Sequence, residues 1–281
     1  MTLVALCSLK GSPGVTTTAL GLASHWPTGQ TPVVVECDPA GGDVLARFRL
    51  GLFPGLVSLA AAARRADDPD LLWQHIQRLR GGLRVVVGPP GAEQARAALE
   101  QLIRDGETLL RGPAERAGTV VIADCGRAEA HSLAMPVLRQ ADVTLVLARA
   151  RDDALAHVAV EVDALRGWSS EPVLVLVGDG YGADEVTSEL GITVLARLPE
   201  DPRGAALLRG TAGRRAATTR SALGKVLTSV ARQLAERGLR ASEQVEVDVT
   251  VEELAAPSLR FTLPADGRPV RPAPSTDGAT P

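Results

Sequence analysis

The sequence predicts an α/β protein with a three-layer, doubly wound and mostly parallel sheet of the P-loop type. Seven short runs rich in valine and leucine are expected as strands, at 2–9, 32–38, 83–89, 119–125, 143–149, 172–178 and 192–199. They lack the apolar/polar alternation of a half-exposed antiparallel sheet, which indicates strands buried on both faces. Most are separated by segments with helical periodicity, and repeated βα units of this kind form parallel sheets with right-handed crossovers.

Helices are predicted between these strands, at roughly 16–26, 57–80, 92–116, 131–140, 152–168, 182–190, 203–210 and 218–238. An open parallel sheet binds its ligands at the carboxyl ends of its strands. The residues that follow each apolar run are therefore the candidates for chemistry.

The 281-residue chain, 45% hydrophobic, is long enough for one large domain, which we place at 1–240. Residues 241–281 start acidic and end rich in Pro, Gly, Ser and Thr, so we expect a mostly disordered Pro-rich tail. No apolar run approaches the ~18 residues of a membrane span, and the amino terminus lacks a basic leader with an apolar core. A cytoplasmic protein is expected. The net charge of −3 gives no general attraction to nucleic acid.

A candidate phosphate loop joins the first predicted strand to the first predicted helix. It has the sequence Lys10-Gly11-Ser12-Pro13-Gly14-Val15-Thr16-Thr17. A strand, a glycine-bearing turn and a helix amino terminus form an anion site, because free N–H groups and the helix dipole point at the ligand. The general pattern GxxxxGK[ST] fails at Leu9 and at Val15. An incidental turn beside a surface lysine is the alternative interpretation.

This loop resembles the deviant phosphate loop of the MinD/ParA ATPase family, KGGxGKT[ST]. Lys10 matches the signature lysine, Gly11, Gly14, Thr16 and Thr17 match, and Ser12 replaces a glycine. Val15 stands where the family has the lysine that touches the β- and γ-phosphates. The resemblance implies that Lys10 reaches the phosphates of a partner subunit in a nucleotide-sandwich dimer. Only two residues in the chain are lysine, Lys10 and Lys225, which favours a function for Lys10.

Two acidic segments also resemble family elements. In VVVECDPAGGDV (33–44), Glu36 takes the place of the first aspartate of the family's switch and Asp38 that of the aspartate that positions the attacking water. Asp38-Pro39 as a simple turn is the alternative. In TVVIADCGR (119–127), Asp124 matches the aspartate that holds Mg²⁺ through water, together with Thr16. Cys-Gly-Arg replaces the family's prolyl pair after it.

The base-binding side is predicted from Pro199-Glu200-Asp201-Pro202, which resembles the family loop whose backbone borders the adenine. The family's Asn-Arg pair is replaced by Gly178-Asp179-Gly180-Tyr181. Asp179 is a candidate acceptor from the exocyclic amine of adenine, and Tyr181 is a candidate ring for stacking on the base. Turn composition favours the alternative that both are ordinary loop residues.

The resemblance implies a nucleotide-dependent positioning or partitioning protein that binds ATP and Mg²⁺ and works as a homodimer. Loss of one charged contact costs ~1.5–3 kcal/mol, and hydrolysis suffers more because charge develops in the transition state. We therefore expect weak or absent hydrolysis, with Lys10 or an arginine such as Arg127 supplying charge. One alternative is a pseudo-ATPase scaffold that recruits a protein partner in septum or pilus localisation. Another is an ATP-dependent ligase or synthetase of the same superfamily.

Two further groups of residues are candidate sites. Five arginines, Arg203, Arg209, Arg214, Arg215 and Arg220, lie in a segment without acidic residues. They are candidates for non-specific DNA binding, with a solvated linker as the equal alternative. Cys7, Cys37 and Cys125 all fall at strand ends, so the three thiols are expected to lie close together. A metal or redox cluster is one interpretation, and ordinary core packing is favoured over it because metal sites usually show tighter spacing.

Overall fold

The computed structural model describes residues 2–65, 68, 70–104, 107–209 and 219–237. The chain divides into two compact units, Met1–Ser242 and Glu243–Pro281. All described residues belong to the first unit. The predicted tail, 241–281, lies outside the described residues.

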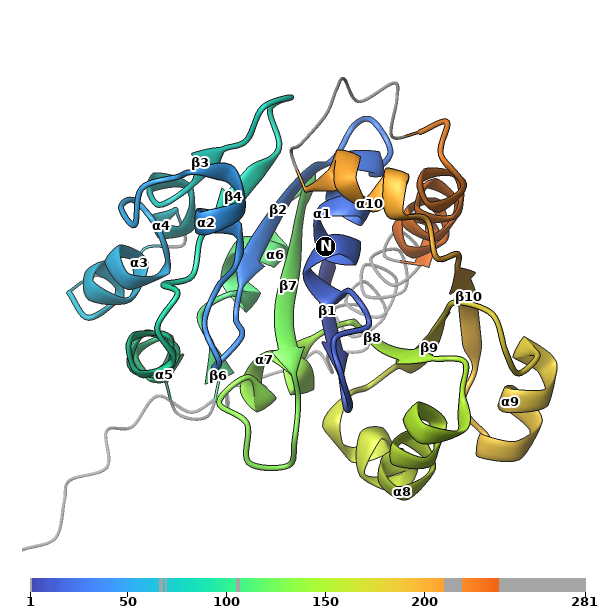
Figure 1. Ribbon diagram of the computed structural model, residues 1–281. Helices are drawn as coiled ribbons and strands as arrows, with labels where there is room; N and C mark the ends of the chain where they lie inside the picture. Colours follow the sequence, from blue (N-terminus) through green and yellow to red (C-terminus); the bar gives the residue numbers. More distant parts are fainter. Residues whose placement is uncertain (1, 66–67, 69, 105–106, 210–218, 238–281) are drawn as a thin grey trace, which may run out of the picture. The chain divides into compact units, whose positions relative to one another are not determined.

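In the described part of the chain, the main sheet has eight strands in the order β10-β9-β8-β1-β7-β2-β4-β3 (Figure 1). Their bounds are β1 Thr2–Ser8, β2 Thr31–Glu36, β3 Gln77–Arg78, β4 Arg84–Val86, β7 Thr119–Arg127, β8 Val143–Arg149, β9 Pro172–Val177 and β10 Val194–Leu198. All neighbours run parallel except β3, which pairs antiparallel with β4 at the edge. The predicted fold class is confirmed, and each of the seven predicted strands is present.

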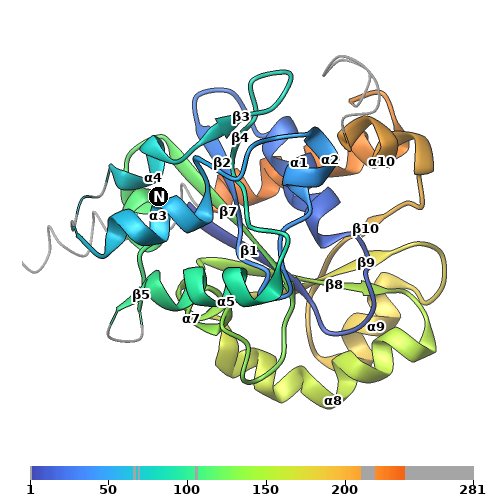
Figure 2. The same ribbon diagram turned by 60° about the vertical axis from the view of Figure 1, so that its left-hand side comes forward.

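Helices follow the strands and cover both faces of the sheet (Figures 1 and 2). They are α1 Val15–His25, α2 Val44–Phe48, α3 Leu56–Ala63, α4 Leu71–Gln74, α5 Ala92–Gln101, α6 Arg111–Glu115, α7 Met135–Gln140, α8 Asp152–Trp168, α9 Ala183–Leu190 and α10 Pro202–Leu208. Residues 222–237 form a further helix. The predictions for the first helix and for 131–140, 152–168, 182–190 and 203–210 agree with these bounds to within a few residues.

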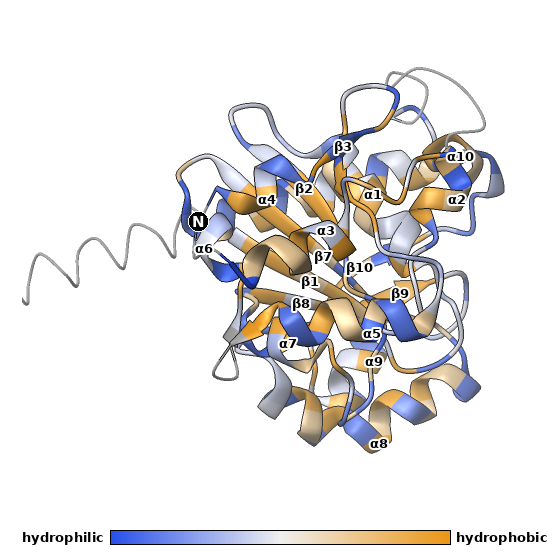
Figure 3. Cartoon of the chain, turned by 90° about the vertical axis from the view of Figure 1, so that its left-hand side faces the viewer, coloured by the Kyte–Doolittle hydropathy of each residue, from blue (hydrophilic) through white to orange (hydrophobic). Residues whose placement is uncertain are grey.

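Two buried clusters pack the sheet, one on each face. The first lies under α3, α5, α7, α8 and α9, and the second lies under α1, α2, α10 and the helix 222–237. Figure 3 shows hydrophobic strands in the interior and hydrophilic residues on the outer sides of the helices. The strands are hydrophobic on both sides because both of their faces are covered.

The prediction of one helix over 57–80 is wrong. The segment forms α3 and the short α4, followed by β3. The carboxylate of Asp68 accepts a hydrogen bond from the backbone N–H of Asp70 at 2.8 Å, a local turn that competes with helix continuation. Periodicity alone did not reveal this break.

The prediction of one helix over 92–116 is also wrong. Helix α5 ends at Gln101, and two short antiparallel strands follow, β5 Ile103–Arg104 and β6 Glu107–Thr108, before α6. The residues between these strands are Asp105-Gly106, a dipeptide strongly preferred in two-residue hairpins. That signal outweighs the helical spacing of the neighbouring leucines.

Candidate functional site

The phosphate loop connects the carboxyl end of β1 to the first residue of α1. Gly11 and Gly14 both have left-handed backbone, with φ of 69° and 104°. A Cβ at either position would meet nothing within 4 Å, so open space lies beside the loop. Gly14 directly precedes α1, whose first N–H groups are therefore aimed toward this space. The loop has the shape that an anion site requires.

Val15, in contrast, belongs to the hydrophobic core. Its side chain is 6% exposed and packs in the cluster under α1. The position of the lysine in the MinD/ParA phosphate loop is therefore occupied here by a side chain that packs α1 against the core. Lys10 and Ser12 are exposed, and Thr16 and Thr17 are half-buried.

Thr16 and Asp124 lie next to each other at the carboxyl ends of the central strands. The Thr16 side chain makes a hydrogen bond with the Asp124 carboxylate, which also accepts from the backbone N–H of Gly126 at 3.3 Å. Asp124 is 2% exposed, and burial raises its pKa to about 6. A buried carboxylate of this kind is expensive to ionise unless a cation offsets it. A hydroxyl beside a carboxylate is also a donor set that suits Mg²⁺.

Glu36 ties the neighbouring loop to the sheet. Its carboxylate accepts from the backbone N–H groups of Asp43 at 2.7 Å, Val44 at 2.9 Å and Gly88 at 2.9 Å. Burial raises the pKa of Glu36 to about 7, and the nearby Asp124 adds to the increase, although the three N–H donors oppose it. Glu36 therefore holds the 36–44 segment and the end of β4 together. Sequence reasoning placed Glu36 in the switch but missed this role.

Asp38 lies against the carboxyl-terminal end of β7. Its carboxylate accepts from the N–H of Ala40 at 2.8 Å, and a Cβ on Gly126 would lie only 1.9 Å from Asp38 Oδ2. Gly126 also has a left-handed φ of 59°. Burial raises the pKa of Asp38, and the coulombic influence of Asp38 raises that of Asp124. Asp38, Asp124 and the phosphate loop thus all lie at the carboxyl ends of the three adjacent strands β2, β7 and β1, as the sequence predicts.

The predicted base-binding loop is held by its own side chains. Glu200 pairs with Arg149 at 2.5 Å, and a Cβ on Gly178 would lie 3.1 Å from the Glu200 carboxylate. This ion pair crosses the end of β9. Asp201 caps α10 by accepting from the N–H of Gly204 at 2.8 Å. Its carboxylate serves the fold, which leaves the backbone of Pro199, Glu200 and Asp201 as the part that can border a base.

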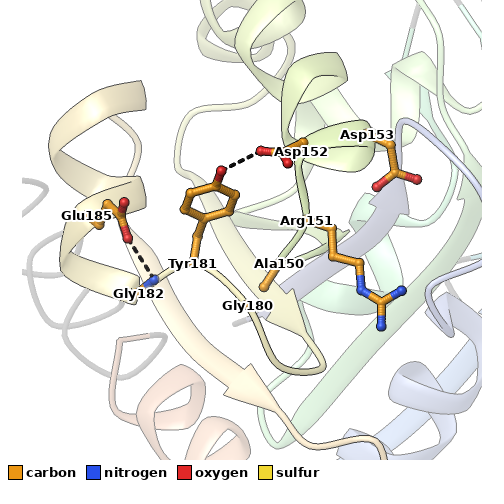
Figure 4. A pocket seen from close by; sticks show the side chains of 8 residues that line it. All are labelled: Ala150, Arg151, Asp152, Asp153, Gly180, Tyr181, Gly182 and Glu185. Atoms are coloured by element: carbon orange, nitrogen blue, oxygen red, sulfur yellow. Dashed lines mark hydrogen bonds between the residues drawn. The ribbon is translucent and has the colours of Figure 1, made fainter.

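Tyr181 lies in the loop between β9 and α9. It lines an open pocket of about 710 Å³ between the starts of α8 and α9, with Arg151, Asp152 and Glu185 among the lining residues (Figure 4). The Tyr181 hydroxyl donates to Asp152, and Asp179 is exposed. Both residues lie in the loop between β9 and α9, and a role for either at the base stays a prediction.

The three cysteines do lie together, as their strand positions predict. Each is fully buried, and Cys125, on the strand between the other two, interacts electrostatically with both. Burial raises the pKa of all three thiols, which disfavours the thiolate form that acts as a nucleophile. Among the described residues no group of His, Cys, Asp and Glu is arranged to hold a metal ion, which argues against the thiol-metal alternative.

The arginine segment is described only in part. Arg203, Arg209 and Arg220 are exposed, whereas Arg214 and Arg215 lie outside the described residues. Arg127, the arginine suggested as a source of charge, is exposed at the end of β7. None of the helices in the described ranges combines the length and hydrophobicity needed to cross a membrane.

Arg47 was missed by sequence reasoning. It lies in α2, a five-residue helix that is too short to be predicted from hydrophobic periodicity. Its side chain forms an ion pair with Asp43, one helical turn earlier. Its positive charge acts on Asp124 and lowers the pKa of that carboxyl against the effect of burial. The sequence carries no signal for this arrangement because Arg47 and Asp124 lie far apart along the chain.

A parallel sheet covered on both faces, with a glycine loop between its first strand and first helix, fits the P-loop class of α/β folds. Within that class, the fold is that of the ParA and MinD ATPases. The structure matches a ParA family ATPase from Chlorobium tepidum with a TM-score of 0.65 and 17% identity over 82% of this chain and 97% of that one. The cell division ATPase MinD from Pyrococcus furiosus gives 0.65 and 17% over 84% and 98%.

MinD from Pyrococcus horikoshii, solved in complex with Mg-ADP, has a TM-score of 0.61 and 14% identity over 83% of this chain and 95% of that one. No model of a known protein family matches the sequence, and no individual curated protein matches it. The likeness therefore appears in the fold, and it agrees with the resemblance predicted from the motifs.

Proposed function

We propose that this protein is a nucleotide-dependent positioning or partitioning protein that binds ATP with Mg²⁺ and hydrolyses it weakly or not at all. The observation that carries the proposal is the contrast at the start of α1. Thr16 contacts Asp124, whereas the neighbouring Val15 is buried in the core. Thr16 and Asp124 are the groups that would hold Mg²⁺, and Val15 leaves the position of the family's phosphate-binding lysine without a charge.

Binding and hydrolysis respond differently to that loss. The open space beside Gly11 and Gly14 and the N–H groups at the start of α1 favour a bound phosphate. One missing charged hydrogen bond lowers affinity by roughly ten- to a hundred-fold, using ~1.4 kcal/mol per decade. Phosphoryl transfer depends more strongly on such contacts because its transition state concentrates charge.

Dimerisation belongs to the same proposal. Lys10 is exposed beside the loop, and within the described residues it makes no ion pair. A free ammonium at that position is available to the phosphates of a second copy. The P. horikoshii MinD complex with Mg-ADP supports the choice of nucleotide and metal by likeness of fold.

The test compares the wild type with Lys10→Ala, Val15→Lys and Val15→Met. ATP binding, ATP turnover and the molecular mass in solution are measured for each. Met matches the length of the lysine stem without its charge, and the apolar stem of either residue can stay in the core while the ammonium of lysine reaches the loop. We expect the wild type to bind ATP with negligible turnover and Val15→Lys to gain turnover. Val15→Met should show no more ATP turnover than the wild type.

Lys10→Ala is expected to lose nucleotide-dependent dimerisation and to keep nucleotide binding by the monomer. Turnover by the wild type at the rate of an ordinary ParA or MinD ATPase would overturn the proposal. If none of the four proteins binds ATP, the protein is instead a scaffold that recruits a partner without nucleotide.

A further inference from the structure

We propose that the β3–β4 hairpin and the loop before α3 form a binding site for single-stranded nucleic acid. Arginines of the hairpin bind the phosphates, and the exposed ring of Phe53 stacks on a base. The site lies at the outer edge of the sheet on β3, and the strands β4, β2 and β7 separate it from β1 and the phosphate loop. The inference goes beyond the proposed function and does not depend on it.

Three arginines gather on the β3–β4 hairpin, which projects from the edge of the sheet (Figure 1). Arg78 is paired directly with Arg84 across the antiparallel ladder, and Arg80 follows in the turn. Leu79 and Val85, the residues that alternate with this pair, are both buried in the cluster under α1 and α2. The side chains of Arg78 and Arg84 therefore share the other face of the hairpin.

This pairing of like charges is unfavourable in the free protein. The backbone N–H of Leu79 donates to the carbonyl of Leu83 at 2.8 Å, so Arg78 and Arg84 form the neighbouring pair without backbone hydrogen bonds. Directly opposed residues are closest in such a pair, with Cα atoms about 4.5 Å apart. Like charges placed opposite each other destabilise the ladder, and a bound anion relieves that cost.

The described part of the chain supplies no acidic partner for these charges. None of its ion pairs involves Arg78, Arg80 or Arg84. The segment 71–92, which contains the hairpin, has no Asp or Glu. The three guanidinium groups are therefore available to an external anion, and the planar N–H fork of arginine matches phosphate oxygens.

Phe53 is held beside the hairpin by a side chain of β3. It is 62% exposed. The side-chain amide of Gln77 donates to the carbonyls of Gly51 at 2.7 Å and Pro54 at 2.5 Å. These bonds fix the loop on both sides of Phe53 against β3 and leave the ring exposed. Arg49, at the end of α2, adds an exposed positive charge just before the loop.

A single strand is the anion that this combination of groups fits. Proteins that bind single strands combine positive charge along the backbone with aromatic rings on which unpaired bases stack. A protein partner would also need an apolar centre to its interface. Among the large hydrophobic side chains of residues 44–65 and 70–92, only Phe53 is exposed.

The experiment measures nucleic-acid affinity by fluorescence anisotropy between 50 and 200 mM salt, without nucleotide. The probes are an oligothymidylate and an oligouridylate, each of about 20 nucleotides and so longer than one binding site, and a DNA duplex of the same length. The hairpin variant combines Arg78→Gln, Arg80→Gln and Arg84→Gln, and Phe53→Leu removes the ring. A control variant makes the same change of net charge at three exposed arginines elsewhere, Arg96→Gln, Arg139→Gln and Arg232→Gln. Thermal unfolding confirms that each variant is folded.

We expect the wild type to bind both single strands more tightly than the duplex. In the hairpin variant the slope of log affinity against log salt should weaken by about 2, because each phosphate contact of a single strand contributes about 0.7. Phe53→Leu should bind single strands about five-fold less tightly at an unchanged slope, since it loses stacking and no charge. The control variant should match the wild type, and the more tightly bound oligonucleotide identifies the ligand as DNA or RNA.

Three results would reject the site: no binding of either single strand at 50 mM salt, equal losses in the hairpin and control variants, or a duplex bound as tightly as the single strands. Unchanged single-strand affinity in Phe53→Leu would also reject it, because stacking is what distinguishes a single strand from other polyanions.

Discussion

The side chain of Thr16 at the start of α1 makes a hydrogen bond with the buried carboxylate of Asp124 at the end of β7. This contact joins the phosphate loop to the strand that carries the predicted Mg²⁺ aspartate. It also lowers the pKa of Asp124, which burial raises to about 6. A hydroxyl and a carboxylate from different elements are thus held together before any ligand binds.

Replacing Thr16 by valine should weaken both the fold and the metal site. Asp124 would lose a donor to its charged form, and we expect the free energy of unfolding above pH 6 to fall by about 1–2 kcal/mol. Binding of ATP should also lose its dependence on Mg²⁺. Denaturant unfolding and titration of ATP with and without Mg²⁺ measure the two effects. The control is Thr228→Val in the helix 222–237, where the hydroxyl donates to the carbonyl of Gly224. Equal behaviour of the two variants would contradict the prediction.

Glu36 should make the stability of the nucleotide-free protein fall as pH rises. Its pKa in the folded protein is about 7, above the usual 4.5, so folding favours the protonated form. Stability is then greatest below the unfolded pKa and is lost as pH rises through the folded one. The difference corresponds to roughly 3 kcal/mol at full ionisation. Asp124, with a pKa of about 6, adds to the same trend.

The measurement is denaturant unfolding between pH 5.5 and 8 for the wild type, Glu36→Gln and Glu93→Gln. We expect the slope against pH to flatten in Glu36→Gln, although its amide group places a donor against backbone N–H groups and lowers stability throughout. Glu93 is exposed on α5, so its variant should follow the wild type. A wild-type stability that rises over this range would show that Glu36 is not buried in the way described.

Gly126→Ala should be strongly destabilising because two costs coincide there. The new Cβ would lie 1.9 Å from Asp38 Oδ2, and the residue has a φ of 59°. We expect a loss of about 2–4 kcal/mol in the free energy of unfolding. Gly118→Ala is the control, since Gly118 has a φ of 74° but its Cβ would lie 3.7 Å from its nearest neighbour. That variant should lose only ~1 kcal/mol.

The clash and the backbone strain can be separated by adding Asp38→Ala to Gly126→Ala. Removal of the carboxylate should restore the part of the stability that the clash costs and leave the backbone part. If the double variant is no more stable than the sum of the single losses predicts, Asp38 does not pack against Gly126.

The exposed arginines Arg203, Arg209 and Arg220 should bind duplex DNA without sequence preference if the predicted patch is functional. Affinity should fall steeply between 50 and 200 mM salt, and each replaced arginine should reduce the salt slope by about 1. Fluorescence anisotropy with two unrelated duplexes measures this. Arg64→Ala and Arg65→Ala, exposed near the end of α3, serve as controls. Absent binding at low salt, or binding indifferent to salt, would exclude the patch.

The strands were predictable because each is a short apolar run buried on both faces, as in Thr119–Arg127. The position of the phosphate loop followed from the same pattern, since it needs only the sequence order of strand, glycine and helix. Features that depend on residues far apart in the sequence could not be predicted from it. The donors that Glu36 binds include Gly88, 52 residues further along the chain, and no spacing rule connects them. Helix α2 was not predicted because five residues are too few to show hydrophobic periodicity.

Asp201 joins two parts of the chain that the sequence separates. Its carboxylate accepts from Gly204 in α10 and from the N–H of Leu223 in the helix 222–237, at 2.8 and 3.2 Å. A single side chain thus holds the starts of both helices beside the loop that is predicted to border the base. The position of the Pro199–Asp201 loop is therefore tied to the start of the helix 222–237, far from it in the sequence, by one carboxylate.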